Sequence, residues 1–312
     1  MKKLAAAVER DNKLLAAADV TDLPLVVIAG PTASGKTELA IRIAKKFNGE
    51  VISADSRAIY RGLDIGTAKP TSEEQQGIPH WGIDMVDPGE RFTAANFKVY
   101  AQQKISEIRS RGHLPIMAGG TGLYIDSVLY DFKFTAYSNN LDERRKLENK
   151  SLEQLAYHCE KNNIKLPKNI KNKRHIINAI LRRGEDPLKN DKMISNTILV
   201  GIATDRDILR SRIEERAKNI VSNTTINEAI HAAEKWGWYN EAMTGNVYPL
   251  IKQYIDGTIN EIELERKLCV LDWRLAKRQL TWLRRNKDIK WLSIDEAWSY
   301  IVSNLDKSSQ MW

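Results

Sequence analysis

One segment restricts the fold of this chain more than any other: residues 25–47, which read LVVIAGPTASGKTELAIRIAKKF. An apolar, β-branched run ends in Gly30, and a turn that fits the pattern Gly-x-x-x-x-Gly-Lys-Thr follows it. Apolar residues then recur at helical spacing from Leu39 to Phe47. This order of buried strand, glycine-rich turn and helix is typical of a loop that binds a chain of phosphates. The loop alone does not say which phosphates it binds, or whether a phosphoryl group is moved.

Each part of the turn has a physical reason. Its backbone N–H groups converge on anionic oxygens, with a helix N-terminus behind them. Gly30 and Gly35 permit a tight backbone path and close approach of the ligand. Lys36 reaches the outer phosphates as a point charge, and Thr37 offers a hydroxyl to Mg²⁺. We therefore predict a di- or triphosphate site, with Mg²⁺ as cofactor, at Gly30, Pro31, Thr32, Ala33, Ser34, Gly35, Lys36 and Thr37.

Strand and helix patterns alternate around this loop. Apolar runs that end in polar or glycine residues occupy 23–30, 49–56 and 113–125, and strand-then-helix patterns return at 196–220 and 289–298. The alternation predicts an α/β fold of the P-loop type, with a doubly wound parallel sheet. Ligands of such sheets bind at the carboxyl ends of the strands. Residues 30–37, 55–56 and 119–122 should therefore lie along one edge.

The pattern changes near residue 136, where the chain becomes polar, charged and helical with a break at Pro167. We predict a helical insertion domain over 136–189 within a catalytic core formed by 23–135 and 190–312. The C-terminal third of this core is helical and aromatic. Residues 1–22 have the pattern of an amphipathic helix and are expected to form an N-terminal extension.

Composition narrows the class of protein. Lys and Arg number 48 against 40 Asp and Glu, a net charge of +8, and there are eight Trp. This balance suits an RNA partner and equally a solvated basic surface. Cys159 and Cys269 lie too far apart for a zinc motif, and two cysteines make no disulfide framework, so a reducing compartment is expected. Without an apolar run of membrane-spanning length, and with Glu9 interrupting the N-terminal run, we expect neither a membrane span nor a signal peptide.

Asp55 is the acidic residue that follows a predicted strand near the loop. Phosphoryl-transfer enzymes usually place an acid at the end of an apolar strand to hold Mg²⁺, but strand 114–118 ends in Gly119-Gly120. Asp55 follows the strand at 49–53. Its carboxylate either caps the next turn or lies near the phosphate loop, where it binds metal through water or accepts a proton.

Five segments carry a resemblance to a known family. They read, in chain order, GPTASGKT (30–37), VISADSRAIYRGLDIGTAKP (51–70), IPHWGIDMVDPGERFTAANF (78–97), LPIMAGGTGLYI (114–125) and LAKRQLTWLRRNKDIKW (275–291). Together they resemble the tRNA dimethylallyltransferases, also called tRNA isopentenyltransferases. The resemblance runs from about residue 24 to 291 and is densest up to residue 125.

The resemblance implies transfer of a dimethylallyl group from dimethylallyl diphosphate to N6 of adenosine 37, next to the tRNA anticodon. The phosphate loop then holds the diphosphate that departs. Allylic carbon–oxygen cleavage places negative charge on that diphosphate, which N–H dipoles, Lys36 and Mg²⁺ at Thr37 are placed to stabilise. No phosphorus–oxygen bond has to break.

The resemblance also implies roles for single residues. Asp55 becomes the general base that helps the adenine amine shed its proton, and Lys36 and Thr121 complete the catalytic set. The hydroxyl of Thr121 either acts near the reacting centre or caps the helix that follows. The predicted tRNA contacts are Asp55, Ser56, Arg57, Ala58, Thr121, Lys173, Arg174, Lys277 and Arg278.

Two basic stretches, 161–174 and 266–287, are candidate RNA surfaces, and Trp273 and Trp282 in the second either stack on RNA or belong to the core.

The chain also departs from the family pattern at two places. Asp272-Trp273 stands where the family has Thr-Arg. The segment 244–257 keeps the family's tyrosine as Tyr248 but lacks its glycine and its basic residue.

Three alternatives remain open at this stage. A small-molecule kinase explains the phosphate loop but not the other motifs, and would turn over ATP. An adenine-nucleotide isopentenyltransferase would use free AMP or ATP as acceptor. A non-catalytic RNA-binding protein would keep the basic surfaces alone. We expect a cytoplasmic monomer that binds the anticodon stem-loop of tRNA.

Overall fold

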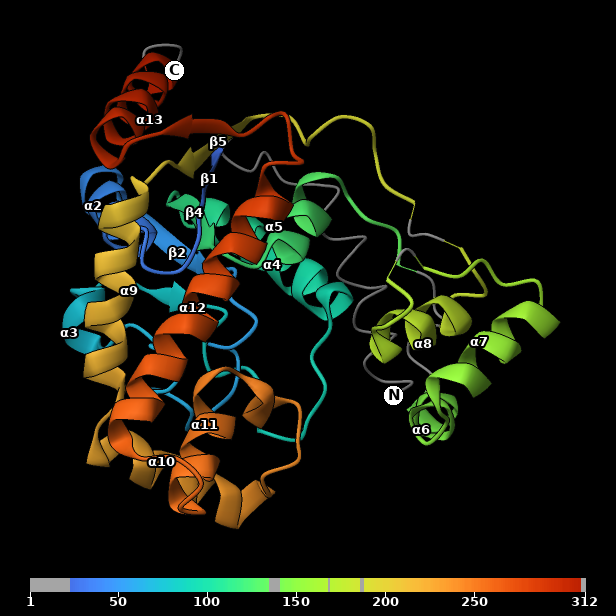
Figure 1. The fold of residues 1–312 in the computed structure, drawn as a ribbon. Helices are drawn as coiled ribbons and strands as arrows, with labels where there is room; N and C mark the ends of the chain where they lie inside the picture. The colour runs from blue at the N-terminus through green and yellow to red at the C-terminus, as the bar shows by residue number, and fades with distance from the viewer. Residues whose placement is uncertain (1–22, 135–140, 168, 186–187, 310–312) are drawn as a thin grey trace. The chain divides into compact units, whose positions relative to one another are not determined.

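The computed structural model describes residues 23–134, 141–167, 169–185 and 188–309 (Figure 1). Its contacts form two compact units: the described parts of Met1–Val128 with Ile194–Trp312, and those of Leu129–Met193. We call the first the core unit and the second the insertion unit. The sequence pattern places the insertion at 136–189, a few residues inside the observed borders. The N-terminal extension predicted at 1–22 lies outside the described residues.

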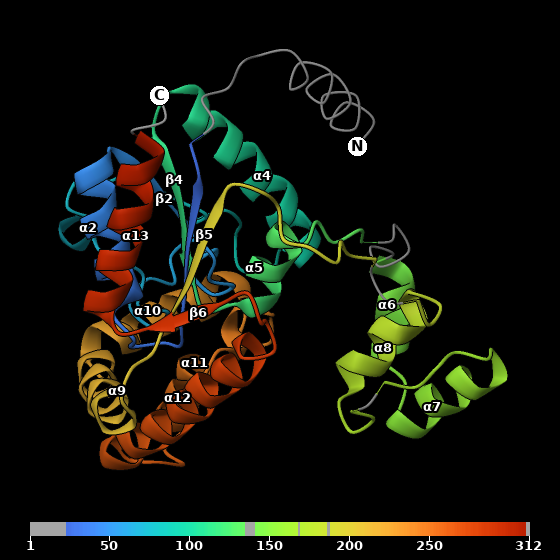
Figure 2. The same ribbon diagram turned by 90° about the horizontal axis from the view of Figure 1, so that it is seen from above.

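The core unit is built on a sheet of six parallel strands in the order β3-β2-β4-β1-β5-β6 (Figure 2). The strands are β1 (Leu25–Ala29), β2 (Gly49–Ser53), β3 (His80–Trp81), β4 (Leu114–Gly119), β5 (Thr197–Ile202) and β6 (Lys290–Leu292). Every residue of β1 and β4 is buried, as continuous apolar strands covered on both faces must be. The doubly wound parallel sheet predicted from the sequence is confirmed.

Helices cover both faces of the sheet (Figure 2). On one face lie α2 (Lys36–Phe47) and α13 (Ile294–Ser309), whose apolar side chains join those of four strands in one cluster. On the other lie α4 (Ala94–Ser110) and α5 (Gly122–Leu129), where the rings of Phe97 and Tyr124 stack 4.2 Å apart. The predicted edge strand and helix at 289–298 are observed as β6 and α13.

The C-terminal third of the core unit is mainly helical, as the sequence pattern predicts. The core unit also contains α3 (Ser72–Gln75), α9 (Arg206–Ile220), α10 (Asn223–Trp236), the 3₁₀ helix η2 (Ala242–Thr244), α11 (Val247–Ile255) and α12 (Glu261–Leu283). Helices α9 to α12 bury a second apolar cluster with the turn after β2. The longest of them, α12, packs on α9 and α11.

The insertion unit contains α6 (Leu141–Glu148), α7 (Leu152–Lys161) and α8 (Lys173–Leu181). Leu155 and Cys159 of α7 pack against Ile176 and Ile180 of α8 in a small apolar core of its own. Among all the helices that the structure describes, none combines the length and the apolar composition that crossing a bilayer requires.

Candidate functional site

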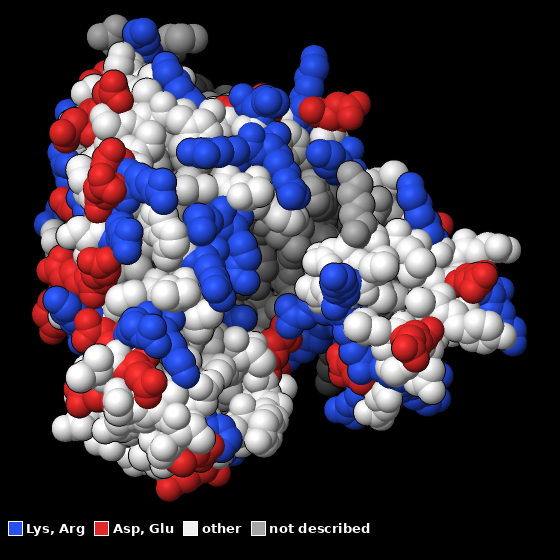
Figure 3. All heavy atoms as spheres, in the orientation of Figure 1, with Lys and Arg blue, Asp and Glu red and all other residues white. Residues whose placement is uncertain are grey.

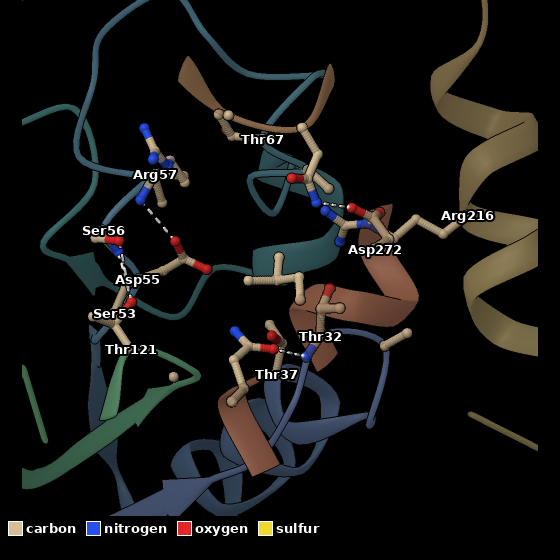
Figure 4. Close-up of a pocket in the computed structure, with 18 of the residues that line it drawn as sticks. Thr32, Thr37, Ser53, Asp55, Ser56, Arg57, Thr67, Thr121, Arg216 and Asp272 are labelled. Atoms are coloured by element: carbon tan, nitrogen blue, oxygen red, sulfur yellow. Dashed lines mark hydrogen bonds and ion pairs between the residues drawn. The ribbon is translucent and has the colours of Figure 1, made fainter. Parts of the chain in front are cut away.

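A cavity of about 530 Å³ opens at the carboxyl ends of β1, β2 and β4 (Figure 4). Its volume falls in the range of small-molecule sites, roughly 300–1,000 Å³. The three segments predicted to share this edge, 30–37, 55–56 and 119–122, all contribute to its lining. Helices α9 and α12 and the residues around the start of α11 close the opposite side.

The phosphate loop, residues 30–37, leads from β1 into α2. Gly35 has φ of 84°, in the left-handed region that glycine adopts without strain. A side chain at Gly30 would place its Cβ 2.7 Å from Oγ of Ser34. Gly30 and Pro31 lie outside the cavity lining, which includes Thr32, Ala33, Ser34, Gly35, Lys36 and Thr37. The loop thus has the conformation that its glycine pattern predicts.

Lys36 is the cation at the centre of this loop. Its Nζ donates a hydrogen bond to the carbonyl oxygen of Pro31 at 3.0 Å. Burial of the ammonium lowers the pKa of Lys36 to about 8, the nearby carboxylate of Asp55 works in the opposite direction, and the Arg216 guanidinium lowers it further. Lys36 therefore carries its charge at neutral pH and loses it in mildly alkaline solution.

Asp55 enters the cavity from the turn after β2. Its Oδ1 accepts the backbone N–H of Arg57 at 2.7 Å, so the carboxylate caps this turn as the sequence suggests. Figure 4 shows the other carboxylate oxygen pointing into the cavity. The two roles weighed for Asp55 are therefore compatible, because one oxygen supports the turn while the other faces the ligand space.

Thr121 lies beside Asp55 on the same wall. Its Oγ1 accepts the backbone N–H of Ser56 at 3.0 Å and lies 3.3 Å from the Ser56 hydroxyl. Its own N–H donates to the carbonyl oxygen of Ala54 at 3.1 Å. The hydroxyl therefore ties the turn after β4 to the turn after β2 and fixes the position of the residues that follow Asp55.

Gly119 is required where these two turns meet. A Cβ at this position would lie 2.2 Å from the carbonyl oxygen of Ala54, a backbone atom that cannot move without separating β2 from β4. We expect Gly119→Ala to lower the free energy of unfolding by about 1–3 kcal/mol, the usual cost of overpacking. Urea denaturation measures this change. Gly245→Ala is the matched control, since its Cβ would meet only Cδ of Arg57 at 3.9 Å; an equal loss in both variants would contradict the prediction.

Helix α12 closes the cavity above the phosphate loop. Oε1 of Gln279 accepts the backbone N–H of Thr32 at 2.8 Å, and a Cβ at Gly120 would lie 2.4 Å from Nε2 of Gln279. One turn later Trp282 packs against Gly122, where a Cβ would lie 2.1 Å from its ring. Trp282 is 36% exposed, so it is a surface contact of α12 rather than a core residue.

The basic residues of α12 that were predicted to contact RNA differ in position. Arg278 lines the cavity, whereas Lys277 is exposed with its Nζ 5.9 Å from the centre of the Trp273 ring. Further exposed cations on and just after α12 are Arg266, Arg274, Arg284, Arg285 and Lys287. Figure 3 shows Lys and Arg side chains gathered on the face along which α12 runs.

Lys173 and Arg174 belong to the insertion unit, at the start of α8. Nζ of Lys173 donates to the carbonyl oxygen of Glu148 at 2.6 Å, and the backbone N–H of Arg174 donates to Oδ1 of Asn172 at 3.1 Å. Neither residue lines the cavity. Their contact with tRNA stays a prediction.

Sequence reasoning missed Arg216 as a site residue. It projects from α9 into the cavity, where its Nε lies 3.5 Å from Oδ2 of the buried Asp272 (Figure 4). In the sequence, Asp272 is marked only by its departure from the family pattern. Oδ1 of Asp272 accepts a hydrogen bond from Nδ2 of Asn246 at 2.8 Å. No local motif marks Arg216; only the packing of α9 on α12 brings it to the phosphate loop.

Glu228 of α10 organises the wall opposite the loop. Its carboxylate accepts the backbone N–H groups of Asp64, Ile65 and Gly66 at 2.7, 2.8 and 2.9 Å, and the hydroxyl of Tyr248 at 2.9 Å. Burial and the neighbouring Glu228 carboxylate raise the pKa of Tyr248. Tyr248, which the chain keeps from the family pattern, is thus a neutral donor that supports this wall.

The side chains of the cavity suit a magnesium ion only when a phosphate ligand is bound as well. Thr37 and Asp55 both line the cavity, but in the described part of the chain no three His, Cys, Asp or Glu residues cluster closely enough to hold a metal. Mg²⁺ commonly binds through one or two protein groups, water and the phosphates of its substrate. The hydroxyl of Thr37, with Asp55 opposite, suits that mode.

The chain matches one family over most of its length. The family described as "IPP transferase" matches residues 58–286. A tRNA dimethylallyltransferase of Staphylococcus epidermidis is 39% identical over 296 residues, covering 86% of each chain. One of Acetivibrio thermocellus is 39% identical over 299 residues, covering 90% of this chain and 96% of the relative.

Solved structures agree in fold. The tRNA isopentenylpyrophosphate transferase of Bacillus halodurans superposes with a TM-score of 0.70 at 34% identity, covering 92% of this chain and 98% of that one. A eukaryotic dimethylallyltransferase acting on tRNA gives a TM-score of 0.72 at 21% identity, covering 87% and 74%. The latter likeness concerns the fold alone.

Proposed function

This chain belongs to the IPP transferase family, and we infer from this membership that it is a tRNA dimethylallyltransferase. It transfers a dimethylallyl group from dimethylallyl diphosphate to tRNA and releases diphosphate. The similarity favours this activity over an adenine-nucleotide isopentenyltransferase or a small-molecule kinase. In the structure, the observation that carries the inference is that the phosphate loop and Asp55 face each other across one cavity.

We propose that residues 32–37 hold the diphosphate of the donor. The N-terminus of α2 and the N–H groups of the loop would attract the anion, and Lys36 adds a charge at neutral pH. Arg216 and Arg278 supply further cations from α9 and α12. As the allylic carbon–oxygen bond breaks, its electron pair passes to the diphosphate, and these preorganised groups stabilise the negative charge where it develops.

Magnesium is part of this proposal. Thr37, together with phosphate oxygens and water, would hold the ion, with Asp55 within the same cavity. When bound, Mg²⁺ supplies charge stabilisation to the departing diphosphate. The chain's own contribution is to present a hydroxyl at the start of α2, next to the ammonium of Lys36.

We propose N6 of adenosine 37 as the acceptor, with Asp55 as its general base. A carbon–nitrogen bond forms while the allylic carbon–oxygen bond breaks, and the proton lost from the amine passes to the carboxylate of Asp55. The oxygen that faces the cavity is free of the turn and therefore placed for this role. Thr121 keeps the Asp55 turn in place through Ser56. Such general-base assistance contributes about 10²–10⁴-fold in rate.

We propose that the anticodon stem-loop approaches over α12. Its exposed cations suit RNA phosphates, and Ser56, Arg57 and Ala58 line the cavity where an extruded base would enter. Lys173 and Arg174 of the insertion unit are proposed as additional tRNA contacts. We further propose that the protein acts as a cytoplasmic monomer.

A single transfer assay tests the proposed function. Dimethylallyl diphosphate carrying a labelled allyl group is incubated with the protein, Mg²⁺ and one of three acceptors: an anticodon stem-loop with adenosine 37, the same loop with guanosine there, or AMP. We expect label only on the adenosine loop. Label on AMP alone would overturn the assignment, and so would hydrolysis of ATP in a parallel reaction if no label reaches the RNA.

Diphosphate binding should depend on pH through Lys36. Because its pKa is lowered to about 8, the ammonium is present at pH 7 and lost progressively above pH 8. We expect the affinity for inorganic diphosphate to fall up to about tenfold per pH unit above that point, since the neutral amine must take up a proton to bind. Calorimetry from pH 6.5 to about 9.5 measures this.

Lys36→Arg is the control for the pH effect. Its guanidinium stays charged throughout this range, while the protonation of the ligand itself changes in the same way for both proteins. The ratio of the wild-type affinity to the Lys36→Arg affinity should therefore be constant below about pH 8 and fall above it. A ratio that stays flat across the range would contradict the lowered pKa.

A further inference from the structure

Asp272 is a carboxylate buried in the wall of a cavity that we propose binds an anion. Asp272 is only 3% exposed. A buried carboxylate without partners is costly, and next to a diphosphate it would also repel the ligand. Its presence there therefore needs a physical reason, which lies in the two side chains that it contacts.

Asn246 and Arg216 divide the two oxygens of Asp272 between them. Nδ2 of Asn246 donates to Oδ1 at 2.8 Å, and Nε of Arg216 lies 3.5 Å from Oδ2. Each partner comes from a different element: Asn246 directly precedes α11, and Arg216 belongs to α9. The carboxylate on α12 therefore joins three helices at one point of the cavity wall.

The way in which Arg216 is held leaves most of its guanidinium available. Asp272 meets the Nε side of the group, and a guanidinium carries further N–H groups on its terminal nitrogens. The side chain remains 27% exposed and lines the cavity. Its charge acts on the ammonium of Lys36, so the guanidinium lies near the phosphate loop.

Two places at which the chain departs from the family resemblance are thus in contact, Asp272 and, through Asn246, the segment 244–257. Asp272 stands where the family has threonine, and Asn246 lies in the segment that lacks the family's glycine. They are 26 residues apart in sequence and joined by one hydrogen bond. A threonine has a single hydroxyl oxygen and no charge, so it would not hold Arg216 in the same way.

We propose that Asp272, anchored by Asn246, is a positioning residue that fixes Arg216 through Nε and so aims its remaining N–H groups at the diphosphate. This inference rests on the proposed function. The two roles of Asp272 can be distinguished by neutralising its carboxylate. Diphosphate binding should weaken if Asp272 positions Arg216 and tighten if it only repels the ligand.

The experiment measures the dissociation constant of inorganic diphosphate by calorimetry, with and without Mg²⁺, for wild type and Asp272→Asn. The amide keeps the shape of the side chain but carries no charge, so the ion pair that holds Arg216 is lost. We expect binding about tenfold weaker or more under both conditions, the worth of one hydrogen bond to a charged group. Glu215→Gln, which removes an exposed charge from α9 next to Arg216, should bind as the wild type does.

Two further variants separate positioning from other roles. Combined with Arg216→Ala, Asp272→Asn should weaken binding no further, since the group that the carboxylate positions is gone. Asn246→Ala should weaken binding in the same direction as Asp272→Asn, because the carboxylate loses its anchor. Unfolding midpoints of all variants are compared, and a common loss of stability with unchanged diphosphate binding would show a structural role only and overturn the inference.

Two other results for Asp272→Asn would contradict the positioning role. Tighter binding by Asp272→Asn would mean that the carboxylate only repels the ligand. Weakening that occurs only with Mg²⁺ would make Asp272 a metal ligand. Either result overturns the inference. Diphosphate binding is measured without transfer, so a protein that binds diphosphate as expected but modifies no tRNA would refute the proposed function and leave this inference standing.

Discussion

Replacing Asp55 with asparagine should lower kcat for prenyl transfer by about 10²–10⁴-fold, the range of general-base assistance. Asparagine keeps an acceptor oxygen for the N–H of Arg57, which the carboxylate now binds at 2.7 Å, so the turn after β2 should persist. What is lost is the basic oxygen that faces the cavity. The measurement is single-turnover transfer of labelled dimethylallyl to an anticodon stem-loop with both substrates saturating.

The control for this prediction is Asp295→Asn, which removes an exposed carboxylate from the first turn of α13 on the phosphate-loop side of the sheet. It should transfer at the wild-type rate. If Asp55→Asn kept its single-turnover rate and only raised KM for the RNA, Asp55 would be a binding group and the general base would have to be sought elsewhere.

Replacing Lys36 with methionine should lower kcat by about 10²–10³-fold, the cost of removing one preorganised group from a developing anion. Methionine has a similar length and no charge, so the cavity keeps its shape. The ammonium donates to the carbonyl oxygen of Pro31 and lies near the start of α2, where no other lysine lines the cavity among the described residues. Neighbouring cations on α9 and α12 cannot occupy its place.

Lys45→Met on the same helix is the matched control, because Lys45 is exposed near the other end of α2. It should have wild-type kcat and wild-type affinity for diphosphate. Equal losses in the two variants would indicate damage to α2 instead of loss of a catalytic charge.

Much of the fold could be predicted from the sequence because its strands are continuous apolar runs that end in recognisable turns. β1, β2 and β4 fall within the predicted ranges, and their ends carry the glycine and acidic residues of the site. β3 could not be found in this way. It is only His80–Trp81, and its pairing with β2 rather than any local pattern makes it a strand.

Most of the predicted residues that line the cavity lie where a motif and a strand end coincide; Arg278, predicted from the resemblance, lines it from α12. Lys36 stands at the end of the loop after β1, and Asp55 and Thr121 lie in the turns after β2 and β4, so parallel topology brings them together. Arg216 and Gln279 come from helices whose sequence shows ordinary amphipathic patterns. Their entry into the cavity depends on how α9 packs on α12, a tertiary relation that no spacing in the sequence encodes.

The hydrogen bonds accepted by Glu228 determine how this wall of the cavity opens locally. One carboxylate accepts three successive backbone N–H groups, of Asp64, Ile65 and Gly66, and the hydroxyl of Tyr248. This arrangement has no partly open state, because loss of the Glu228 carboxylate would leave all four donors without an acceptor at once. The segment from 64 to 66 should therefore open cooperatively as one exchange unit, with its three amides sharing a single hydrogen-exchange protection factor.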